Sequence, residues 1–277
     1  MPRRLRLDAE LVRRGLARSR EQAAELVSAG RVTVAGAVAT KPATGVTTDA
    51  AIVVRDDPTR PDYVSRGGHK LAGALDAFAP ALDVRDRRCL DAGASTGGFT
   101  DVLLRRGARE VVAVDVGYGQ LAWSIRQDPR VDVHDRTNIR ELTPDLVGEP
   151  VDVVVGDLSF ISLTLVLDAL LGVTAGDGDL VLMVKPQFEV GKDRVGKGGV
   201  VRDPELWVSA VAGVADLAEQ RGWGAVGVTP SPLPGPSGNV EFFVWLRRGP
   251  ATVQAAERDA VVRAGTGPSA PGEKVGP

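Results

Sequence analysis

The chain has 277 residues, of which 43% are hydrophobic and 25% charged, and its formal net charge is −2. This length suffices for one full-sized domain and a small one, and the composition is that of an ordinary globular protein. The single cysteine, Cys89, excludes an internal disulfide, and the two histidines, His69 and His134, are too few and too scattered for a zinc site.

No segment reaches the roughly 18 consecutive apolar residues that a membrane-spanning helix needs. The best candidate, residues 163–173, is interrupted by Asp168, and the arginine-rich N-terminus has no apolar signal core after it. We therefore expect a soluble, cytoplasmic protein that binds no metal.

Charge is unevenly distributed along the chain. Residues 1–60 contain 11 Lys and Arg against 7 Asp and Glu, so this segment is net +4 and the remainder is net −6. A basic segment on an acidic body predicts contact with a polyanion.

The basic segment has the pattern of a small αβ module. Apolar residues recur at helical spacing through 7–12, Gly15 can end this helix, and Ser19 opens a second one with an S-x-x-Q capping box. Short strands are predicted at 31–34 and 51–54. Arginines crowd the first turns, and the candidate contacts to the polyanion are Arg3, Arg4, Arg6, Arg14, Arg18 and Arg20.

A polar stretch at 55–68, marked by Pro and Gly, predicts a boundary before a helix over 70–78. Strands and helices then alternate, with strands expected at 88–93, 110–116, 131–135, 151–157, 179–186, 225–233 and 240–248. Continuously apolar strands in this alternation predict an α/β fold with a doubly wound parallel sheet. A Pro/Gly loop joins the last two strands, so the last strand should be antiparallel. The tail over 249–277 is rich in Gly, Ala and Pro, and we expect it to be disordered.

The stretch "CLDAGASTGGFTDVLL" (89–104) is the sharpest local signal. A strand ends near Asp91, and a glycine-rich turn opens an apolar helix, so backbone N–H groups are offered to a ligand. The next strand ends in Asp115, where a carboxylate can accept hydrogen bonds from ribose hydroxyls. The spacing D-x-G-x-x-x-G-G departs from the dinucleotide pattern and suits a ligand with an ammonium group, such as S-adenosylmethionine. Candidate loop contacts are Asp91, Gly93, Ala94, Ser95, Thr96, Gly97 and Phe99.

Four charged residues are expected at or near the carboxyl ends of the strands, where doubly wound folds bind ligands. Asp157 ends the strand "VDVVVGD" and Lys185 ends "LVLMVK", while Lys70 begins the helix before the sheet and Glu241 opens the last strand. Each of these residues also has a purely structural explanation, such as a helix cap or a solvated surface charge. Their joint position favours a catalytic site.

These motifs resemble the TlyA family of ribosomal RNA methyltransferases. The resemblance covers roughly residues 3–247 and rests on "RGGHKL", "DAGASTGGFTDVLL", "DRTNIR", "GDLSFISL", "VKPQFE" and "GNVEFFVWL", in this order. It implies a Rossmann-like, FtsJ-like methyltransferase domain at 67–248. It also implies an RNA-binding domain of the ribosomal-protein-S-four type at 1–58 and a linker at 59–66.

By the same resemblance, Lys70, Asp157, Lys185 and Glu241 match a catalytic K-D-K-E tetrad. The cofactor would be S-adenosylmethionine, and the substrate would be cytidine 2′-hydroxyls of small- and large-subunit rRNA, in subunits or whole 70S ribosomes. Family linkers carry an aromatic residue, and Tyr63 stands here where Trp is expected. Arg66 is a further candidate RNA contact, and we expect a monomer.

The residue chemistry agrees with this reading. A ribose hydroxyl is a poor nucleophile at neutral pH, and a lysine ammonium held against it by a carboxylate favours the alkoxide. We assign Lys185 to the 2′-oxygen, Asp157 to orienting Lys185, and Lys70 with Glu241 to positioning the ribose. Leu158-Ser159-Phe160 follows Asp157 in place of the two prolines often found in amine methyltransferases. Cys89 lies inside a strand, which disfavours a cysteine nucleophile.

Other features carry weaker expectations. Asp135 or Asn138 can reach the adenine edge of a cofactor, although a polar turn explains them equally well. The basic, glycine-rich segment 190–203 favours slightly a mobile loop over RNA. Three alternative functions are a membrane-active haemolysin, a non-catalytic RNA-binding assembly factor and pseudouridine synthesis. The last rests only on Arg6-Leu7-Asp8, which we interpret as a helix start.

Overall fold

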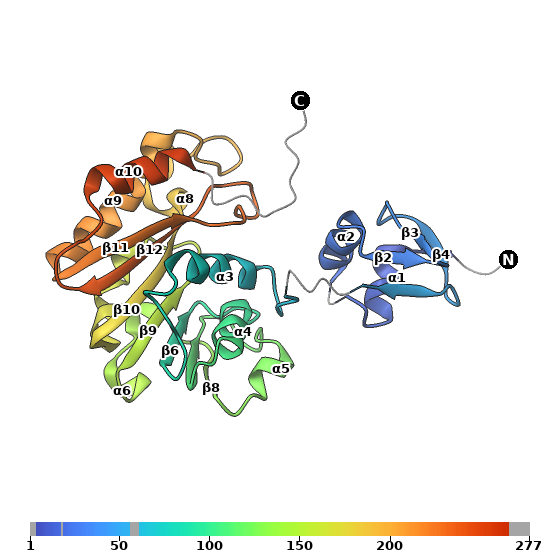
Figure 1. The fold of residues 1–277 in the computed structure, drawn as a ribbon, viewed down its shortest axis with the longest axis horizontal. Helices are drawn as coiled ribbons and strands as arrows, with labels where there is room; N and C mark the ends of the chain where they lie inside the picture. The colour runs from blue at the N-terminus through green and yellow to red at the C-terminus, as the bar shows by residue number, and fades with distance from the viewer. Residues whose placement is uncertain (1–3, 18, 56–60, 266–277) are drawn as a thin grey trace. The chain divides into compact units, whose positions relative to one another are not determined.

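The computed structural model describes residues 4–17, 19–55 and 61–265 (Figure 1). The chain divides into two compact units, residues 1–62 and 63–277. Within these described ranges, no helix is long and apolar enough to cross a membrane.

The first unit packs two helices beside short antiparallel strands. Its elements are β1 (Arg4–Arg6), α1 (Leu7–Arg13), α2 (Arg20–Ser28), β2 (Val32–Val34), β3 (Ala37–Val38), β4 (Gly45–Thr47) and β5 (Ile52–Val54). Strand β2 lies between β3 and β5, and β1 pairs with β4. The Ser19 hydroxyl accepts from the Gln22 N–H at the start of α2, which confirms the predicted N-cap. Leu7, Leu11 and Val27 form the centre of the core.

The second unit is built on a seven-stranded sheet in the order β11-β12-β10-β9-β6-β7-β8. The strands are β6 (Arg88–Ala92), β7 (Glu110–Val114), β8 (Val131–His134), β9 (Val151–Gly156), β10 (Thr174–Val184), β11 (Trp223–Pro230) and β12 (Phe242–Arg248). The five strands from β10 to β8 are parallel, and β12 runs antiparallel to both of its neighbours. The predicted doubly wound sheet with an antiparallel last strand is confirmed.

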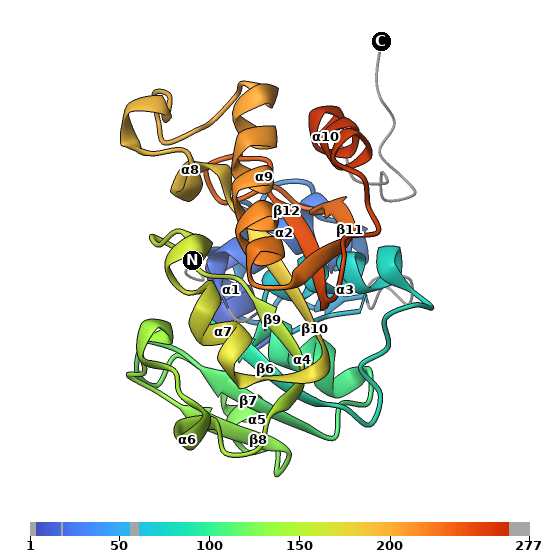
Figure 2. The ribbon, with the colours of Figure 1, turned by 90° about the vertical axis from the view of Figure 1, so that its left-hand side faces the viewer.

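Helices cover both faces of this sheet (Figure 2). They are α3 (Gly67–Phe78), α4 (Gly98–Arg105), α5 (Trp123–Arg126), α6 (Pro144–Val147), α7 (Leu167–Val173), α8 (Pro186–Glu189) and α9 (Pro204–Gln220), with short 3-10 turns η1 (Ile139–Glu141), η2 (Leu163–Leu165) and η3 (Lys192–Arg194). Alternate residues of β9 enter separate cores: Val153 and Val155 pack in the cluster with α3 and α4, and Val154 packs in the cluster with α7 and α9. This two-sided burial explains why the strands read as continuous apolar runs.

The predicted disorder over 249–277 is wrong for the part of the tail that the structure describes. Helix α10 (Ala255–Ala264) packs against α9 and β11, and Val262 is fully buried. Ion pairs from Arg258 to Asp216 and from Arg263 to Glu205 hold it in place. One buried apolar residue gives little periodicity, so composition concealed a helix that tertiary contacts stabilise. Residues 266–277 lie outside the described ranges.

The segment predicted as a linker, 59–66, is divided by the structure. Tyr63 begins the second unit, where its side chain is buried and packs so closely on Gly68 that a Cβ there would lie 2.5 Å from it. The Arg105 guanidinium lies 5.2 Å from the centre of the Tyr63 ring. Residues 63–66 are therefore an ordered start of the second unit, and residues 56–60 lie outside the described ranges.

Candidate active site

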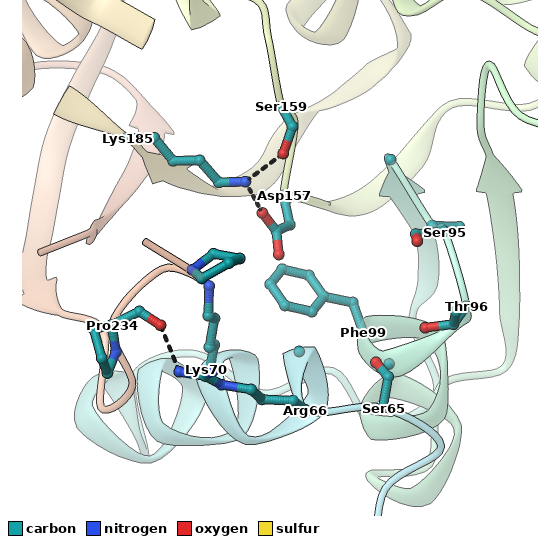
Figure 3. Close-up of a pocket in the computed structure, with 15 residues that line it drawn as sticks. Ser65, Arg66, Lys70, Ser95, Thr96, Phe99, Asp157, Ser159, Lys185 and Pro234 are labelled. Carbon is teal, nitrogen blue, oxygen red and sulfur yellow. Dashed lines mark hydrogen bonds and ion pairs between the residues drawn. The ribbon is translucent and has the colours of Figure 1, made fainter. Parts of the chain in front are cut away.

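A cavity of about 280 Å³ opens at the carboxyl ends of β6, β9 and β10. Its walls come from the start of α3, the glycine loop after β6, the residues that follow β9 and β10, and the loop before β12 (Figure 3). Parallel strands end at the same edge of a sheet, which is why residues from distant parts of the sequence meet here.

Asp157 and Lys185 form an ion pair in this cavity. The Lys185 Nζ lies 2.5 Å from the Asp157 Oδ1 and donates to the Ser159 Oγ at 2.8 Å (Figure 3). Their strands, β9 and β10, are direct neighbours in the sheet. Ser162, not Asp157, caps the turn η2 that follows. The orienting contact expected between this carboxylate and this lysine is therefore present.

Lys70 and Glu241 form a second pair, in which the Nζ and Oε2 atoms are 2.5 Å apart. Lys70 lines the cavity, whereas Glu241 is only 1% exposed and lies behind it. The Glu241 Oε1 has no hydrogen-bond partner in the described part of the chain, and a Cβ on Gly235 would lie 2.5 Å from it. A glycine at this position of the 231–239 loop is therefore needed to enclose the pair.

The glycine loop brings its backbone against the cavity. Gly93 has φ +83°, and a Cβ there would lie 3.0 Å from the Asp157 carbonyl oxygen. Gly97 has φ +94°, and a Cβ there would meet Leu121 at 2.9 Å. Both positions combine left-handed backbone with close approach, which only glycine accepts without strain. The predicted contacts Gly93, Ala94, Ser95, Thr96 and Phe99 line the cavity, whereas the predicted contact Gly97 does not.

The two predicted cofactor carboxylates, Asp91 in β6 and Asp115 directly after β7, make hydrogen bonds within the protein. Asp115 accepts from the N–H groups of Ser95 at 2.8 Å and Gly117 at 2.7 Å. Asp91 is fully buried and accepts from the Thr100 hydroxyl at 2.7 Å, while its Oδ1 has no hydrogen-bond partner among the described residues. Burial, with a smaller contribution from the Asp157 charge, raises the pKa of Asp91 to about 7, although the Thr100 hydrogen bond acts to lower it. Neither Asp91 nor Asp115 lines the cavity itself.

The structure also places Asp135 and Asn138 outside the cavity lining. Asp135 accepts from Arg126 at 2.8 Å, and this bond lowers the pKa of the carboxyl. The Asn138 side chain accepts from the Arg140 N–H and caps η1. Both residues thus have local structural roles, and a contact to a cofactor remains a prediction.

The predicted RNA-contacting arginines have unequal surroundings. Arg6 and Arg20 both reach Asp8, at 2.8 and 3.0 Å, and hold the pKa of its carboxyl well below its usual range. Arg14 instead donates to Glu10 and to the Ala50 carbonyl, both at 2.7 Å, so its guanidinium stabilises the first unit.

Of the other four predicted contacts, two lie within the described residues. Arg4 is exposed on β1, and Arg66 donates to the Pro234 carbonyl at 2.7 Å. Arg3 and Arg18 lie outside the described residues.

Ser159 is a site residue that the sequence analysis did not assign, and its neighbour Phe160 lies outside the cavity lining. Ser159 accepts from Lys185, and Phe160 is 92% exposed with φ +65°. The Phe160 ring lies 5.4 Å from that of Phe188. The serine two residues after the strand-end acid was the available signal for Ser159.

Comparison with known proteins places the chain in a family. The family model described as FtsJ-like methyltransferase matches residues 63–248, and the S4 domain model matches residues 5–52. A protein of Mycobacterium tuberculosis named 16S/23S rRNA (cytidine-2′-O)-methyltransferase TlyA is 62% identical over 95% of this chain and 98% of its own. The chain is therefore an enzyme of the FtsJ-like methyltransferase family, in the branch that contains TlyA.

Two further similarities bear on function. Hemolysin A of Brachyspira hyodysenteriae is 36% identical over 86% of this chain and 98% of its own. A solved structure from Streptococcus thermophilus, provisionally described as a hemolysin, has a TM-score of 0.74 and 36% identity, with 96% of each chain covered.

Proposed function

We propose that this enzyme transfers the methyl group of S-adenosylmethionine to the 2′-hydroxyl of cytidine ribose in small- and large-subunit ribosomal RNA. The observation that carries the proposal is the Lys185–Asp157 pair, 2.5 Å apart at the cavity between the glycine loop and the loop before β12. The name of the M. tuberculosis relative supports the same reaction.

The chain's own residues fit the cofactor. Gly93 lines the cavity and lets the loop backbone approach Asp157 closely. Asp91 keeps one carboxylate oxygen without a hydrogen-bond partner among the described residues, and a nearby ammonium group would stabilise its ionised form. Ser95 and Thr96 also line the cavity. Bound there, S-adenosylmethionine supplies a methyl group already activated by its positive sulfur.

Lys185 acts on the acceptor oxygen. A ribose hydroxyl loses its proton only at high pH, so the negative charge that develops on the 2′-oxygen needs a fixed cation beside it. Asp157 and Ser159 hold the Lys185 Nζ from two sides and leave it directed into the cavity (Figure 3). Lys70, fixed by Glu241, presents a second cation to the ribose–phosphate backbone. The remaining contribution of the site is alignment of the acceptor with the methyl group.

The first unit supplies RNA docking. Its match to the S4 domain and its exposed basic residues, Arg4 and Arg20 among them, fit a phosphate backbone. We propose that the monomeric enzyme meets its substrate in the cytoplasm as ribosomal subunits or 70S ribosomes. Arg66 and residues 190–203 would then add contacts from the second unit.

The test uses the full chain, S-adenosylmethionine labelled in its methyl group, and subunits or 70S ribosomes that lack the modification. We expect label in alkali-resistant dinucleotides, because a 2′-O-methyl group blocks cleavage of the adjoining linkage. Lys185→Ala should give no label, and Arg221→Ala, which changes an exposed arginine paired with Asp168 outside the cavity, should match the wild type. Label recovered on a base would overturn the proposal.

The name of the Brachyspira relative, Hemolysin A, favours one second candidate function, that of a membrane-active protein. The same variants decide between the two. Lysis of erythrocytes by the purified chain that persists in Lys185→Ala would support a lytic activity separate from methyl transfer. Absence of lysis at concentrations that methylate ribosomes fully would exclude it.

A further inference from the structure

We propose that Glu189 is a positioning residue for methyl transfer, which fixes the turn after β9 so that Ser159 stays against Lys185. This inference rests on the proposed function and goes beyond the tetrad. It concerns two segments that flank the cavity: the turn 157–163 after β9, and residues 185–189, in which Lys185 follows β10 and α8 (Pro186–Glu189) begins one residue later.

The Glu189 carboxylate joins these segments at the end distant from the ion pair. It accepts from the Ser162 hydroxyl at 2.5 Å and from the Leu163 N–H at 2.9 Å. Ser162 in turn accepts from the Thr164 N–H at 3.2 Å. A half-buried glutamate is therefore used, through two hydrogen bonds, to hold the N-terminus of the short turn η2.

The turn needs such a restraint because of Phe160. Its φ of +65° is left-handed, a conformation that a bulky side chain adopts only where the surroundings impose it. Phe160 is 92% exposed, so burial of its own side chain does not impose it. Besides the contact of the Phe160 ring with Phe188, the turn is held on both sides, where Ser159 is bonded to Lys185 and Ser162 is bonded to Glu189.

Loss of the outer restraint would reach the chemistry through Ser159. With Ser162 released, the backbone at Phe160 can relax toward an ordinary φ, and this rotation moves the Ser159 hydroxyl away from the Lys185 Nζ. Lys185 then has one fixed partner, Asp157, in place of two. A displacement of about 1 Å at a reacting group can lower a rate by about 100-fold.

The variants Glu189→Ala and Ser162→Ala test this step in single-turnover methylation of ribosomal subunits. We expect Glu189→Ala to slow methyl transfer by about 10- to 100-fold, with the Kd for S-adenosylmethionine unchanged, and Ser162→Ala to slow it less. Glu189→Gln can accept from Leu163 and donate to Ser162, so it should recover most of the rate. Glu205→Ala, which removes an exposed partner of Arg263, is the matched control and should retain the wild-type rate.

A double-variant cycle separates positioning from a general loss of structure. If Glu189 acts through Ser159, Ser159→Ala should add little to the loss already caused by Glu189→Ala. Multiplied losses, an unchanged rate in Glu189→Ala, or a loss that appears only in the Kd for S-adenosylmethionine would overturn the inference. If the wild type forms no 2′-O-methylcytidine, the proposed function fails instead, which distinguishes the two failures.

Discussion

The two lysine–carboxylate pairs of the site share a distance but differ in exposure. In both pairs the nitrogen and oxygen are 2.5 Å apart. Asp157 remains 23% exposed and its lysine also bonds Ser159, whereas Glu241 is 1% exposed and the second neighbour of its lysine is the Met183 sulfur, at 3.9 Å. The two pairs therefore differ in role although their distances are equal. The Asp157 pair is exposed enough to exchange contacts with a substrate, whereas the Glu241 pair is enclosed by the protein.

The largest effect on the methyl-transfer rate is expected from changes to the Lys185–Asp157 pair. Asp157→Asn should lower the methyl-transfer rate by about 100- to 1000-fold, because Lys185 loses the carboxylate that orients it. Because Asp157 is 23% exposed and Ser159 still accepts from Lys185, the free energy of unfolding should fall by less than the about 3–5 kcal/mol expected for a fully buried pair. Single-turnover rates and urea unfolding measure the two effects. Asp168→Asn, in the exposed pair with Arg221, is the control; an Asp157→Asn enzyme with the control's rate would contradict the assignment.

The enclosed Lys70–Glu241 pair should contribute more to stability than the Lys185–Asp157 pair does. Lys70→Met leaves the Glu241 carboxylate buried without its cation, so unfolding free energy should fall by about 3–5 kcal/mol. Lys70→Met combined with Glu241→Leu should recover much of that stability, because no buried charge remains unpaired. Activity should stay low in both variants, since Lys70 lines the cavity. Thermal unfolding monitored by circular dichroism provides the comparison, and equal stabilities of the single and double variants would refute the enclosed role of Glu241.

The effect expected for Asp91 is intermediate in size. Burial raises the pKa of its carboxyl to about 7. In the unfolded chain the pKa of Asp91 is about 4, so burial costs no stability below pH 4, where the carboxyl is protonated in both states. The cost grows between pH 4 and pH 7, where the carboxyl is ionised mainly in the unfolded chain, and it is constant above pH 7. Asp91→Asn removes this penalty. Its unfolding free energy relative to the wild type should therefore rise by roughly 2–3 kcal/mol between pH 5 and pH 8. A difference that is independent of pH in urea unfolding would show that Asp91 titrates normally.

Much of this site followed from the sequence because it depends on strand order. β9 and β10 are consecutive and parallel, so the acid and the lysine at their ends had to become neighbours. The glycine loop followed from its residue types in the same way. The sheet, its antiparallel strand and the Ser19 cap have equally local signals.

Features fixed by tertiary contacts were not predictable. The pairing of Lys70 with Glu241 requires β12 to insert between β10 and β11, and nothing in the loop sequence specifies that. The left-handed Phe160 and the inward-directed Arg14 depend on partners far along the chain. Helix α10 has a single fully buried valine, Val262, so its docking is invisible to periodicity.

The smallest expected effect lies in the first unit. Arg20→Ala should weaken binding to ribosomal RNA by less than about tenfold and reduce the slope of log Kd against log salt concentration by about 1, as for loss of one phosphate contact. The methyl-transfer rate at saturating RNA should not change. Filter binding over a range of salt concentrations measures the slope. Arg221→Ala, at a surface pair of the second unit, is the control, and an identical slope in both variants would contradict RNA docking through Arg20.

The central claim is that Lys185 serves the chemical step and not ligand binding. The most direct measurement is the single-turnover methyl-transfer rate of Lys185→Ala at saturating S-adenosylmethionine and ribosomal subunits, together with its Kd for the cofactor. The account predicts a rate at least about 100-fold below the wild type and a Kd changed by less than about threefold. A wild-type rate, or a loss that saturating cofactor restores, would contradict it.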